Sequence, residues 1–174
     1  MNLLDLANIS QGILRGESTN VESFSIDTRT IKPKEVYIAL KGENFDGHLF
    51  ITEAIKKGAS AIVLDKPVEC NIPNIIVDDS YKFMNHVAVH NRNCFKGKMV
   101  GITGTNGKTT TKQIIANLLN SQGSCHQTVG NKNNQIGVPF SLLTLGNNHD
   151  YSVIEMGTSE PGEIKKLNTL VKPD

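Results

Sequence analysis

The stretch GITGTNGKTTTKQ, residues 101–113, constrains the fold of this chain more than any other part of it. An apolar run precedes it, glycines interrupt it, and apolar residues at helical spacing follow it. A strand, a glycine-rich turn and a helix in this order form a phosphate-binding loop, because the free N–H groups at the helix start surround phosphate oxygens. We therefore predict a nucleotide-binding α/β unit around this stretch.

The loop departs from the standard spacing of such sites. Gly107, Lys108 and Thr109 match the end of the pattern G-x-x-x-x-G-K-[ST], but Ile102 stands where its first glycine is expected. Glycines on either side of Ile102 can still supply backbone angles with positive φ. The residues that we expect to bind the phosphates are Gly104, Thr105, Asn106, Gly107, Lys108, Thr109 and Thr110.

Two side chains of the loop and one distant acid predict phosphate and metal chemistry. We expect Lys108 to place its ammonium on the β/γ-phosphates and Thr109 to offer its hydroxyl to Mg²⁺. Glu155 ends the strand-like run YSVIE, and ligands of open parallel sheets bind beyond the carboxyl ends of strands. Glu155 is therefore predicted as a direct or water-mediated Mg²⁺ ligand, which makes Lys108 and Glu155 the candidate catalytic residues.

The nucleotide base can be judged from the run NKNN at residues 131–134. It resembles the Asn-Lys-x-Asp sequence that reads guanine in GTPases. Asn134 replaces the aspartate, however, and lacks the carboxylate that pairs with the base. ATP is therefore expected rather than GTP.

Apolar runs and helical patterns alternate along the chain, as in α/β proteins. We expect strands within residues 36–40, 59–65, 74–79, 99–103 and 151–157 and helices within 49–58, from residue 80, from residue 108 to near 123, and within 162–171. In the helix after the loop, Ile114, Ile115, Leu118 and Leu119 are expected to form one apolar face. A short polar break at Lys96 to Lys98 places a domain boundary near residue 97, between units 1–96 and 97–174.

Composition narrows the class of protein. The 174 residues have a formal net charge of +1 with scattered lysines, which argues against a nucleic-acid or membrane-surface protein. No run approaches the roughly 20 apolar residues of a membrane-spanning helix, and the N-terminus lacks a secretory signal. Three separated cysteines without a C-x-x-C pair predict neither disulfides nor a zinc site. His86 and His90 resemble half a metal site, but no third ligand is evident and a polar helix face is expected. A cytoplasmic monomer is the expectation.

Four ordered motifs resemble the Mur ligase family, which also includes folylpolyglutamate synthases. GITGTNGKTTTK is similar to the ATP loop of the family, and SIDTRTIKPKEVYIALKGENFDGHLF, which begins at Ser25, resembles its N-terminal uridine-nucleotide domain. GNKNNQIGVPFSLL and VIEMGTSEPGEI resemble blocks of the branch that adds D-alanyl-D-alanine. Together the motifs span about 150 residues, so the resemblance is specific where each motif alone would be weak.

The resemblance implies a fold, a reaction and a set of binding residues. It implies a small N-terminal α/β domain that binds a uridine nucleotide, followed by part of a mainly parallel-sheet, P-loop ATP-binding domain. It implies ATP- and Mg²⁺-dependent formation of an amide bond between UDP-N-acetylmuramoyl tripeptide and D-Ala-D-Ala through an acyl phosphate. The substrate-binding residues carried over from the motifs are Thr28, Arg29, Lys41, Gly42, Asn131 and Asn134.

The sequence differs from the family pattern in two respects. Ser159 and Glu160 stand where the family often has Asn-His, so no role can rest on that histidine. The family's full chain is also much longer, and its adenine pocket, carbamylated lysine and dipeptide-binding domain would lie beyond Asp174. We expect this chain alone not to complete the ligation. Sister ligases, such as the diaminopimelate- or lysine-adding enzyme or folylpolyglutamate synthase, and a non-catalytic binding module remain the alternatives.

Overall fold

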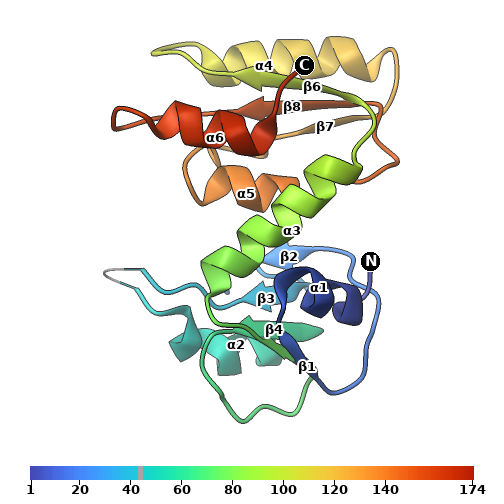
Figure 1. Cartoon of the computed structure of the whole chain (residues 1–174), viewed down its shortest axis with the longest axis vertical. Helices are drawn as coiled ribbons and strands as arrows, with labels where there is room; N and C mark the ends of the chain where they lie inside the picture. The colour runs from blue at the N-terminus through green and yellow to red at the C-terminus, as the bar shows by residue number, and fades with distance from the viewer. Residues whose placement is uncertain (43–44) are drawn as a thin grey trace. The chain divides into compact units, whose positions relative to one another are not determined.

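The computed structural model describes residues 1–42 and 45–174 and divides into two compact units, Met1–Val87 and Ala88–Asp174 (Figure 1). The division falls inside helix α3 (Ser80–Cys94). The domain boundary predicted near residue 97 lies beyond the end of this helix and stays a prediction. Each unit is built from a mainly parallel sheet with helices, which confirms the predicted α/β fold class.

The N-terminal unit is built on a five-stranded sheet with the order β1-β5-β4-β3-β2. β1 runs antiparallel to β5, and the other neighbours are parallel. The parallel arrangement places the carboxyl ends of four strands at one edge of the sheet. The strands are β1 (Ile13–Arg15), β2 (Phe24–Ser25), β3 (Val36–Ile38), β4 (Ala61–Leu64) and β5 (Asn74–Ile76).

Helices α1 (Leu3–Ser10) and α2 (Ile51–Lys56), with the 3-10 helix η1 (Gly47–Phe50), complete this unit beside the start of α3. α1, which the sequence patterns did not predict, begins with a capping box in which Asn2 and Asp5 accept each other's backbone N–H. A buried core lies against α2, and its members are Ile31, Tyr37, Ala39, Ile51, Ala54, Ala59, Ile62 and Leu64. β3 and β4 are buried along their whole length and read as short continuous apolar runs, which explains why they were predictable.

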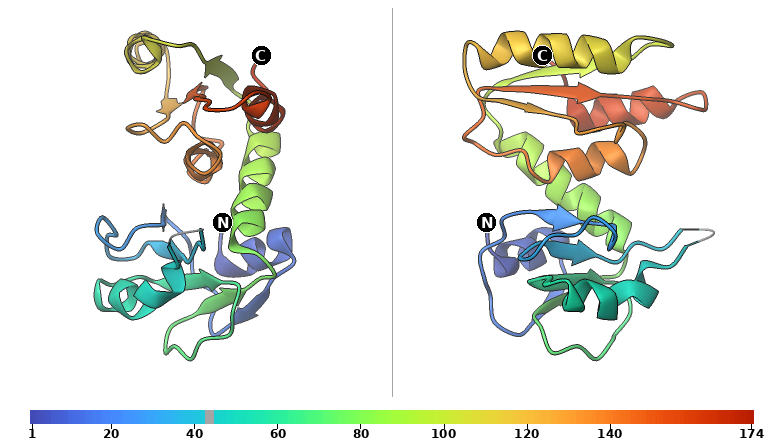
Figure 2. Two further views of the ribbon diagram at one scale, coloured as in Figure 1. Left: turned by 90° about the vertical axis from the view of Figure 1, so that its left-hand side faces the viewer. Right: turned by 180° about the vertical axis from the view of Figure 1, so that it is seen from behind.

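The C-terminal unit has a three-stranded parallel sheet with the order β6-β8-β7. Its strands are β6 (Lys98–Ile102), β8 (Tyr151–Glu155) and β7 (Cys125–Gln127). Helix α4 (Lys108–Asn120) covers one face, and α5 (Gly137–Leu142) and α6 (Glu163–Val171) cover the other (Figure 2). Ile102 pairs in register with Glu155, so β6 and β8 end side by side where α4 begins.

Side chains of these strands alternate between the two faces. Ile102 and Val153 pack with Ala116 beneath α4, whereas Met99 and Ile154 belong to the larger core with α5 and α6. The cluster of buried apolar residues on the α4 side is smaller than the cluster on the α5 and α6 side, because a single helix covers the α4 side.

Two of the four residues predicted to form the apolar face of α4 pack against the sheet, and the other two are exposed. Ile115 and Leu119 pack against the sheet, but Ile114 is 55% exposed and Leu118 is 65% exposed. A helix advances by 100° per residue, so neighbours such as Ile114 and Ile115 cannot share a narrow contact with a sheet. The sheet instead takes the side that carries Lys112 and Ala116, both of which are buried.

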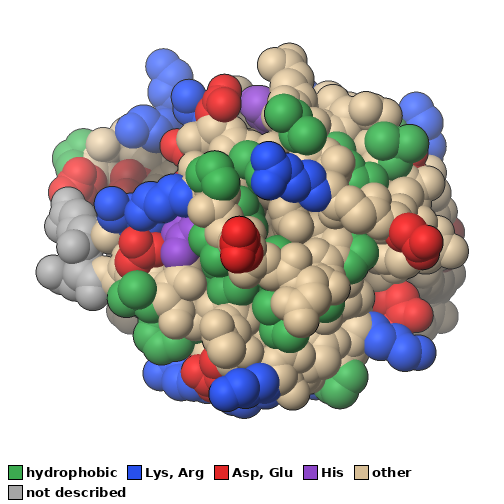
Figure 3. Space-filling view, turned by 90° about the horizontal axis from the view of Figure 1, so that it is seen from below, with side chains coloured by type: hydrophobic (Ala, Val, Ile, Leu, Met, Phe, Trp, Pro, Cys, Tyr) green, Lys and Arg blue, Asp and Glu red, His purple; other side chains and the backbone are tan. Residues whose placement is uncertain are grey.

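The face of the molecule drawn in Figure 3 is not dominated by one kind of charge. On the face drawn in Figure 3, basic and acidic side chains are interspersed. Across the described residues, no helix is both long and apolar enough to span a bilayer.

Candidate active site

The phosphate loop follows the buried end of β6. Ile102 is 8% exposed, and its carbonyl accepts a hydrogen bond from the Met156 N–H at 2.7 Å, so it is a strand residue rather than a loop residue. Gly104 then adopts a φ of +149°, and Gly107 adopts a φ of +76° as the N-cap of α4. Both values favour glycine, so the turn is built around these two residues and needs no glycine at position 102.

Gly101 serves packing rather than phosphate binding. A Cβ on this residue would lie 2.8 Å from the Met156 Cε and 2.8 Å from the Pro173 Cγ. Such distances are too short for carbon atoms in contact. The glycine therefore allows β6 to lie close to the chain that follows α6.

Lys108 and Thr109 start α4 and point to different partners. The Lys108 ammonium donates to the Gly104 carbonyl at 2.6 Å and lies 3.4 Å from the Thr105 carbonyl, which holds the charge over the loop. The Thr109 hydroxyl contacts both carboxylate oxygens of Glu155, at 3.1 and 3.0 Å. The structure thus brings together the two residues predicted to bind Mg²⁺, although they are far apart in the sequence.

Glu155 is a buried carboxylate with several donors. The Asn133 amide donates to Oε1 at 2.8 Å, and the Lys112 ammonium lies 3.4 Å from Oε2. The backbone N–H of Glu155 donates separately to the Thr128 hydroxyl at 3.0 Å. Burial raises the pKa of Glu155, but the hydrogen bonds from Asn133 and Thr109 and the charge of Lys112 outweigh it, so the pKa lies below its usual value. The carboxylate is therefore ionised at neutral pH.

Lys112 and Asn133 are site residues that the sequence patterns missed. Lys112 follows Thr109 by three positions, which places both on the side of α4 that faces β8. That spacing was the available signal, but a lysine in a helix is normally read as exposed. Asn133 lies between the two predicted asparagines, and a Cβ on Gly157 would come within 3.0 Å of its side chain. Gly157 therefore leaves room for the amide beside Glu155.

The two predicted asparagines have other partners in the structure. The Asn134 side-chain oxygen accepts from the N–H groups of Ile136 and Gly137, at 3.2 and 2.8 Å, and so closes the turn into α5. Asn131 is exposed, and its carbonyl accepts from the Asn133 N–H at 2.8 Å. Their contact with substrate or phosphate stays a prediction.

The donor set fits Mg²⁺ bound together with phosphate. Thr109 and Glu155 offer hydroxyl and carboxylate oxygens, the ligand type that Mg²⁺ prefers. Among residues 1–42 and 45–174 there is no group of three His, Cys, Asp or Glu that could hold a metal. Mg²⁺ commonly binds through one or two carboxylates plus phosphate oxygens and water, and this site suits that arrangement.

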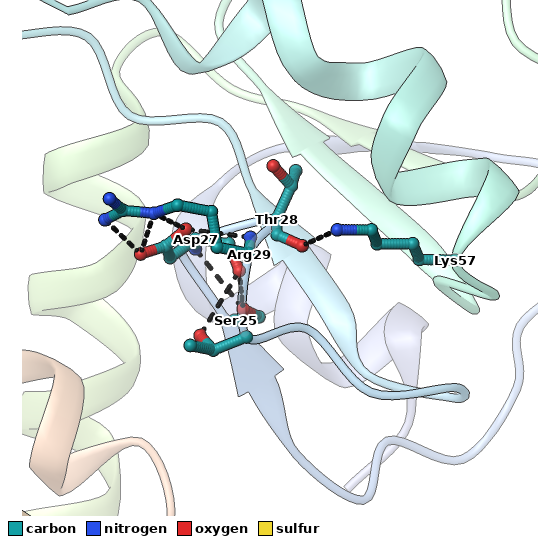
Figure 4. A network of polar contacts seen from close by, with 6 residues as sticks. Ser25, Asp27, Thr28, Arg29 and Lys57 are labelled. Carbon is teal, nitrogen blue, oxygen red and sulfur yellow. Dashed lines mark hydrogen bonds and ion pairs between the residues drawn. The ribbon is translucent and has the colours of Figure 1, made fainter.

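Thr28 and Arg29, two of the predicted uridine-nucleotide residues, follow β2 (Figure 4). The Arg29 guanidinium meets the Asp27 carboxylate at 2.6 Å (Nη2) and 2.9 Å (Nε), and this pairing holds the pKa of Asp27 below its usual value. Thr28 is buried, and its carbonyl accepts from the Lys57 ammonium at 2.7 Å. The Arg29 side chain is 85% exposed, so its guanidinium is accessible to an anion.

Lys41 and Gly42 come after β3. Lys41 forms an isolated bridge with Asp46, and the Gly42 N–H donates to the Phe45 carbonyl at 2.7 Å. The His48 ring contacts the bridge partner of Lys41, since its Nδ1 lies 2.7 Å from the Asp46 Oδ1. Hydrogen bonding to His48 lowers the pKa of Asp46 to about 2.

The polar partners of Thr28 and Arg29 differ from those of Lys41 and Gly42. In the part of the chain that the structure describes, no hydrogen bond or ion pair joins Lys41 or Gly42 to Thr28 or Arg29. A common pocket for the four residues therefore stays a prediction.

The residues in place of the family's Asn-His form a turn around Glu163. Its carboxylate accepts from the N–H groups of Ser159 and Glu160, at 2.7 and 3.1 Å, and from the Thr158 hydroxyl at 3.0 Å. The backbone N–H groups of Ser159 and Glu160 thus anchor the start of α6, and these hydrogen bonds lower the pKa of Glu163.

Comparison with known proteins agrees with this geometry. Residues 20–97 match the family described as Mur ligase family, catalytic domain, and residues 102–174 match the Mur ligase middle domain. The UDP-N-acetylmuramoyl-tripeptide–D-alanyl-D-alanine ligase of Buchnera aphidicola subsp. Acyrthosiphon pisum is 39% identical over all of this chain. The ligase of the same name from Escherichia coli K12 is 36% identical over all of it. The chain spans 38% of the length of each of these relatives.

Solved structures show the same similarity. The D-alanyl-D-alanyl ligase structure from Acinetobacter baumannii matches with a TM-score of 0.88 and 30% identity, over 98% of this chain and 39% of that one. The Thermotoga maritima MurF ligase in complex with ADP matches with a TM-score of 0.71 and 36% identity, over 88% of this chain and 36% of that one. Because two consecutive family domains and these relatives account for nearly all of the sequence, the chain belongs to the Mur ligase family.

Proposed function

We propose that this chain is the UDP-substrate-binding and phosphate-binding part of an ATP-dependent amide ligase of peptidoglycan precursor synthesis. The reaction would join D-Ala-D-Ala to UDP-N-acetylmuramoyl tripeptide. The observation that carries the proposal is the contact of Thr109 with the buried, ionised Glu155 beside Lys108 at the start of α4. The names of the relatives and the ADP complex of a similar structure support the same reaction.

The residues of the C-terminal unit suit phosphoryl transfer. In this class of reaction, ATP phosphorylates the terminal carboxylate of the tripeptide, and the dipeptide amine then attacks the acyl phosphate and displaces phosphate. The N–H groups from Gly104 to Thr110 would bind the phosphates, and Lys108 would exchange its loop carbonyls for phosphate oxygens. Thr109 and Glu155 would hold Mg²⁺, which supplies positive charge to the phosphate oxygens when it is bound.

The N-terminal unit would hold the uridine diphosphate. Arg29 is bound to Asp27 through an exposed ion pair, and such pairs contribute little to stability, so the guanidinium can turn to a diphosphate at low cost. Thr28 would offer its hydroxyl, while Lys41 and Gly42 would meet the same ligand from the segment that follows β3. Asn131 and Asn134 would contact the substrate or the ATP phosphate from the loop before α5.

The remaining partners follow from the reaction. D-Ala-D-Ala and the adenine ring would be bound by parts of the ligase that match no residue of this chain. We further propose a cytoplasmic, monomeric protein that binds neither nucleic acid nor membrane, in keeping with its balanced charge.

Calorimetric titration tests the proposal. We expect measurable binding of UDP-N-acetylmuramoyl tripeptide and weaker binding of Mg-ATP. The tripeptide ligand should bind more tightly than the corresponding dipeptide ligand. The reverse order would favour a diaminopimelate- or lysine-adding ligase, and no binding of either uridine ligand would contradict the proposal. Full ligase activity from this chain alone would contradict the expected weakness of ATP binding.

A further inference from the structure

Lys112 is a buried cation to which the proposed reaction gives no task. The residue is 2% exposed, its ammonium lies 3.4 Å from the Glu155 Oε2, and it donates to the Gly130 carbonyl at 3.1 Å. Lysine is rarely buried to this extent unless a partner balances its charge. Lys112 and Glu155 therefore form a buried ion pair inside the proposed Mg²⁺ site.

The position of this charge affects any cation that approaches Glu155. The Thr109 hydroxyl and the Asn133 amide meet the same carboxylate as neutral groups, whereas Lys112 brings a full positive charge to it. A divalent cation bound to this carboxylate would lie within several ångströms of the ammonium. At such separations the repulsion changes affinity by about tenfold or more, even in a well-screened site.

We propose that Lys112 is a positioning residue that acts as the resident counter-ion of Glu155. It holds the carboxylate in place for the metal and opposes binding of a free divalent cation before the nucleotide arrives. Phosphate oxygens then supply both the negative charge and the missing ligands, so the cation binds together with the nucleotide. This inference rests on the proposed nucleotide site.

The hydrogen bond from Lys112 to Gly130 also connects two segments of the site. Gly130 adopts a φ of +63°, and its carbonyl is bound by Lys112 just before the loop that carries Asn133. The ammonium thus ties α4 to the loop on the other side of Glu155. A test must separate this tie from the effect of charge, because loss of the side chain removes both.

The test uses Mn²⁺ as the probe and follows its free-ion signal by electron paramagnetic resonance, without nucleotide. Lys112→Met keeps most of the stem length and removes the charge, so it should bind Mn²⁺ about tenfold more tightly than the wild type. Lys112→Arg keeps the charge and should bind like the wild type. In the double variant Lys112→Met with Glu155→Gln, the added affinity should disappear. A purely structural role would lower the affinity in Lys112→Met or leave it unchanged, and either result overturns the proposal.

A second measurement keeps the proposal testable if Lys112→Met does not fold. Wild-type protein should bind Mn²⁺ at least about tenfold more tightly with saturating ADP than without it, since the phosphates offset the lysine charge. Equal affinities in the two conditions would overturn the inference. Failure of ADP to bind at all would instead contradict the proposed nucleotide site, and the inference that rests on it would fall with it.

Discussion

Two buried side chains of the C-terminal unit differ in the partners that meet them. Glu155 has a cation and two hydrogen-bond donors on its carboxylate, and it is ionised. His126 lies between the Ser152 hydroxyl at 3.0 Å and the Thr144 hydroxyl at 3.2 Å. The pKa of His126 is lowered to about 4, mainly because the ring is buried and to a smaller extent because His149 lies beside it. The imidazole of His126 is therefore neutral in the folded protein at neutral pH.

Neutral burial of His126 predicts a loss of stability in mild acid. Its folded pKa of about 4 lies below the unfolded value of about 6.5, so the unfolded chain binds more protons between these values. The contribution is fully present above about pH 6.5 and is lost as the pH falls toward 4. We expect the free energy of unfolding, measured by urea denaturation, to fall by roughly 2 kcal/mol from pH 7 to pH 5 on this account.

The matched control for this prediction is His126→Gln, which stays neutral and retains a donor and an acceptor. Its stability should change less between pH 7 and pH 5 than that of the wild type. An equal change in both proteins would show that other groups cause the pH dependence.

The Thr109 hydroxyl predicts a metal-specific defect. Thr109→Val removes the oxygen that contacts Glu155 and keeps the β-branched shape. Affinity for ADP with Mg²⁺ should fall by about tenfold, the worth of one hydrogen bond or ligand oxygen, whereas affinity in EDTA should not change. Thr111→Val, an exposed neighbour on the same helix, is the control and should bind as the wild type does. An equal loss with and without Mg²⁺ would count against a metal role for the hydroxyl.

Part of the candidate active site could be predicted from residue types and their spacing. The remaining residues could be identified only from their contacts in the structure. Gly107, Lys108 and Thr109 could be recognised from their spacing, and Glu155 from its place at a strand end. Lys112 and Asn133 could not, because a buried lysine and a mid-loop asparagine gain their roles only from the carboxylate that they meet. Side-chain partners far apart in the sequence leave no local pattern.

At the scale of helices and strands, length and burial decided what could be predicted. β4 and β8 are apolar runs bounded by turn residues, and α3 and α4 show helical spacing. β1, β2 and β7 contain two or three residues and include polar side chains, so they form no continuous apolar run. α5 is six residues long and buried throughout, so it has no polar face from which a period could be read.

α4 offers a test of its orientation in two adjacent isoleucines. Ile115 packs beneath the helix, whereas Ile114 is exposed. Ile115→Ala should lower the free energy of unfolding by about 2 kcal/mol through lost burial, and Ile114→Ala should change it by less than about 0.5 kcal/mol. Urea denaturation of the two variants gives the comparison. Similar losses in both would mean that α4 faces the sheet with a different side.

At the scale of the whole molecule, each proposed ligand has its own compact unit. The phosphate loop and Glu155 lie within Ala88–Asp174, and Thr28, Arg29, Lys41 and Gly42 lie within Met1–Val87. The family resemblance predicted this order of functions along the chain. The sequence patterns could not predict where the contacts divide, because α3 runs continuously through the boundary.

Separate units predict separable binding defects. Arg29→Ala should weaken binding of UDP-N-acetylmuramoyl tripeptide by about tenfold or more, because a charge-assisted hydrogen bond to the diphosphate is lost, and should leave ADP binding unchanged. Lys108→Ala should weaken ADP binding to a similar degree and leave the uridine ligand unaffected. Calorimetry of both variants with both ligands measures the four affinities.

Arg15→Ala, at another exposed arginine of the N-terminal unit, is the control for loss of surface charge and should bind both ligands normally. The Arg29 pair with Asp27 is exposed, so its loss should cost little stability and leave the variant folded for the measurement. If Arg29→Ala bound the uridine ligand as tightly as the wild type, Arg29 would have no place in the diphosphate site. If each substitution weakened both ligands, the two units would not bind independently, because independent sites can lose only the contacts that they make themselves.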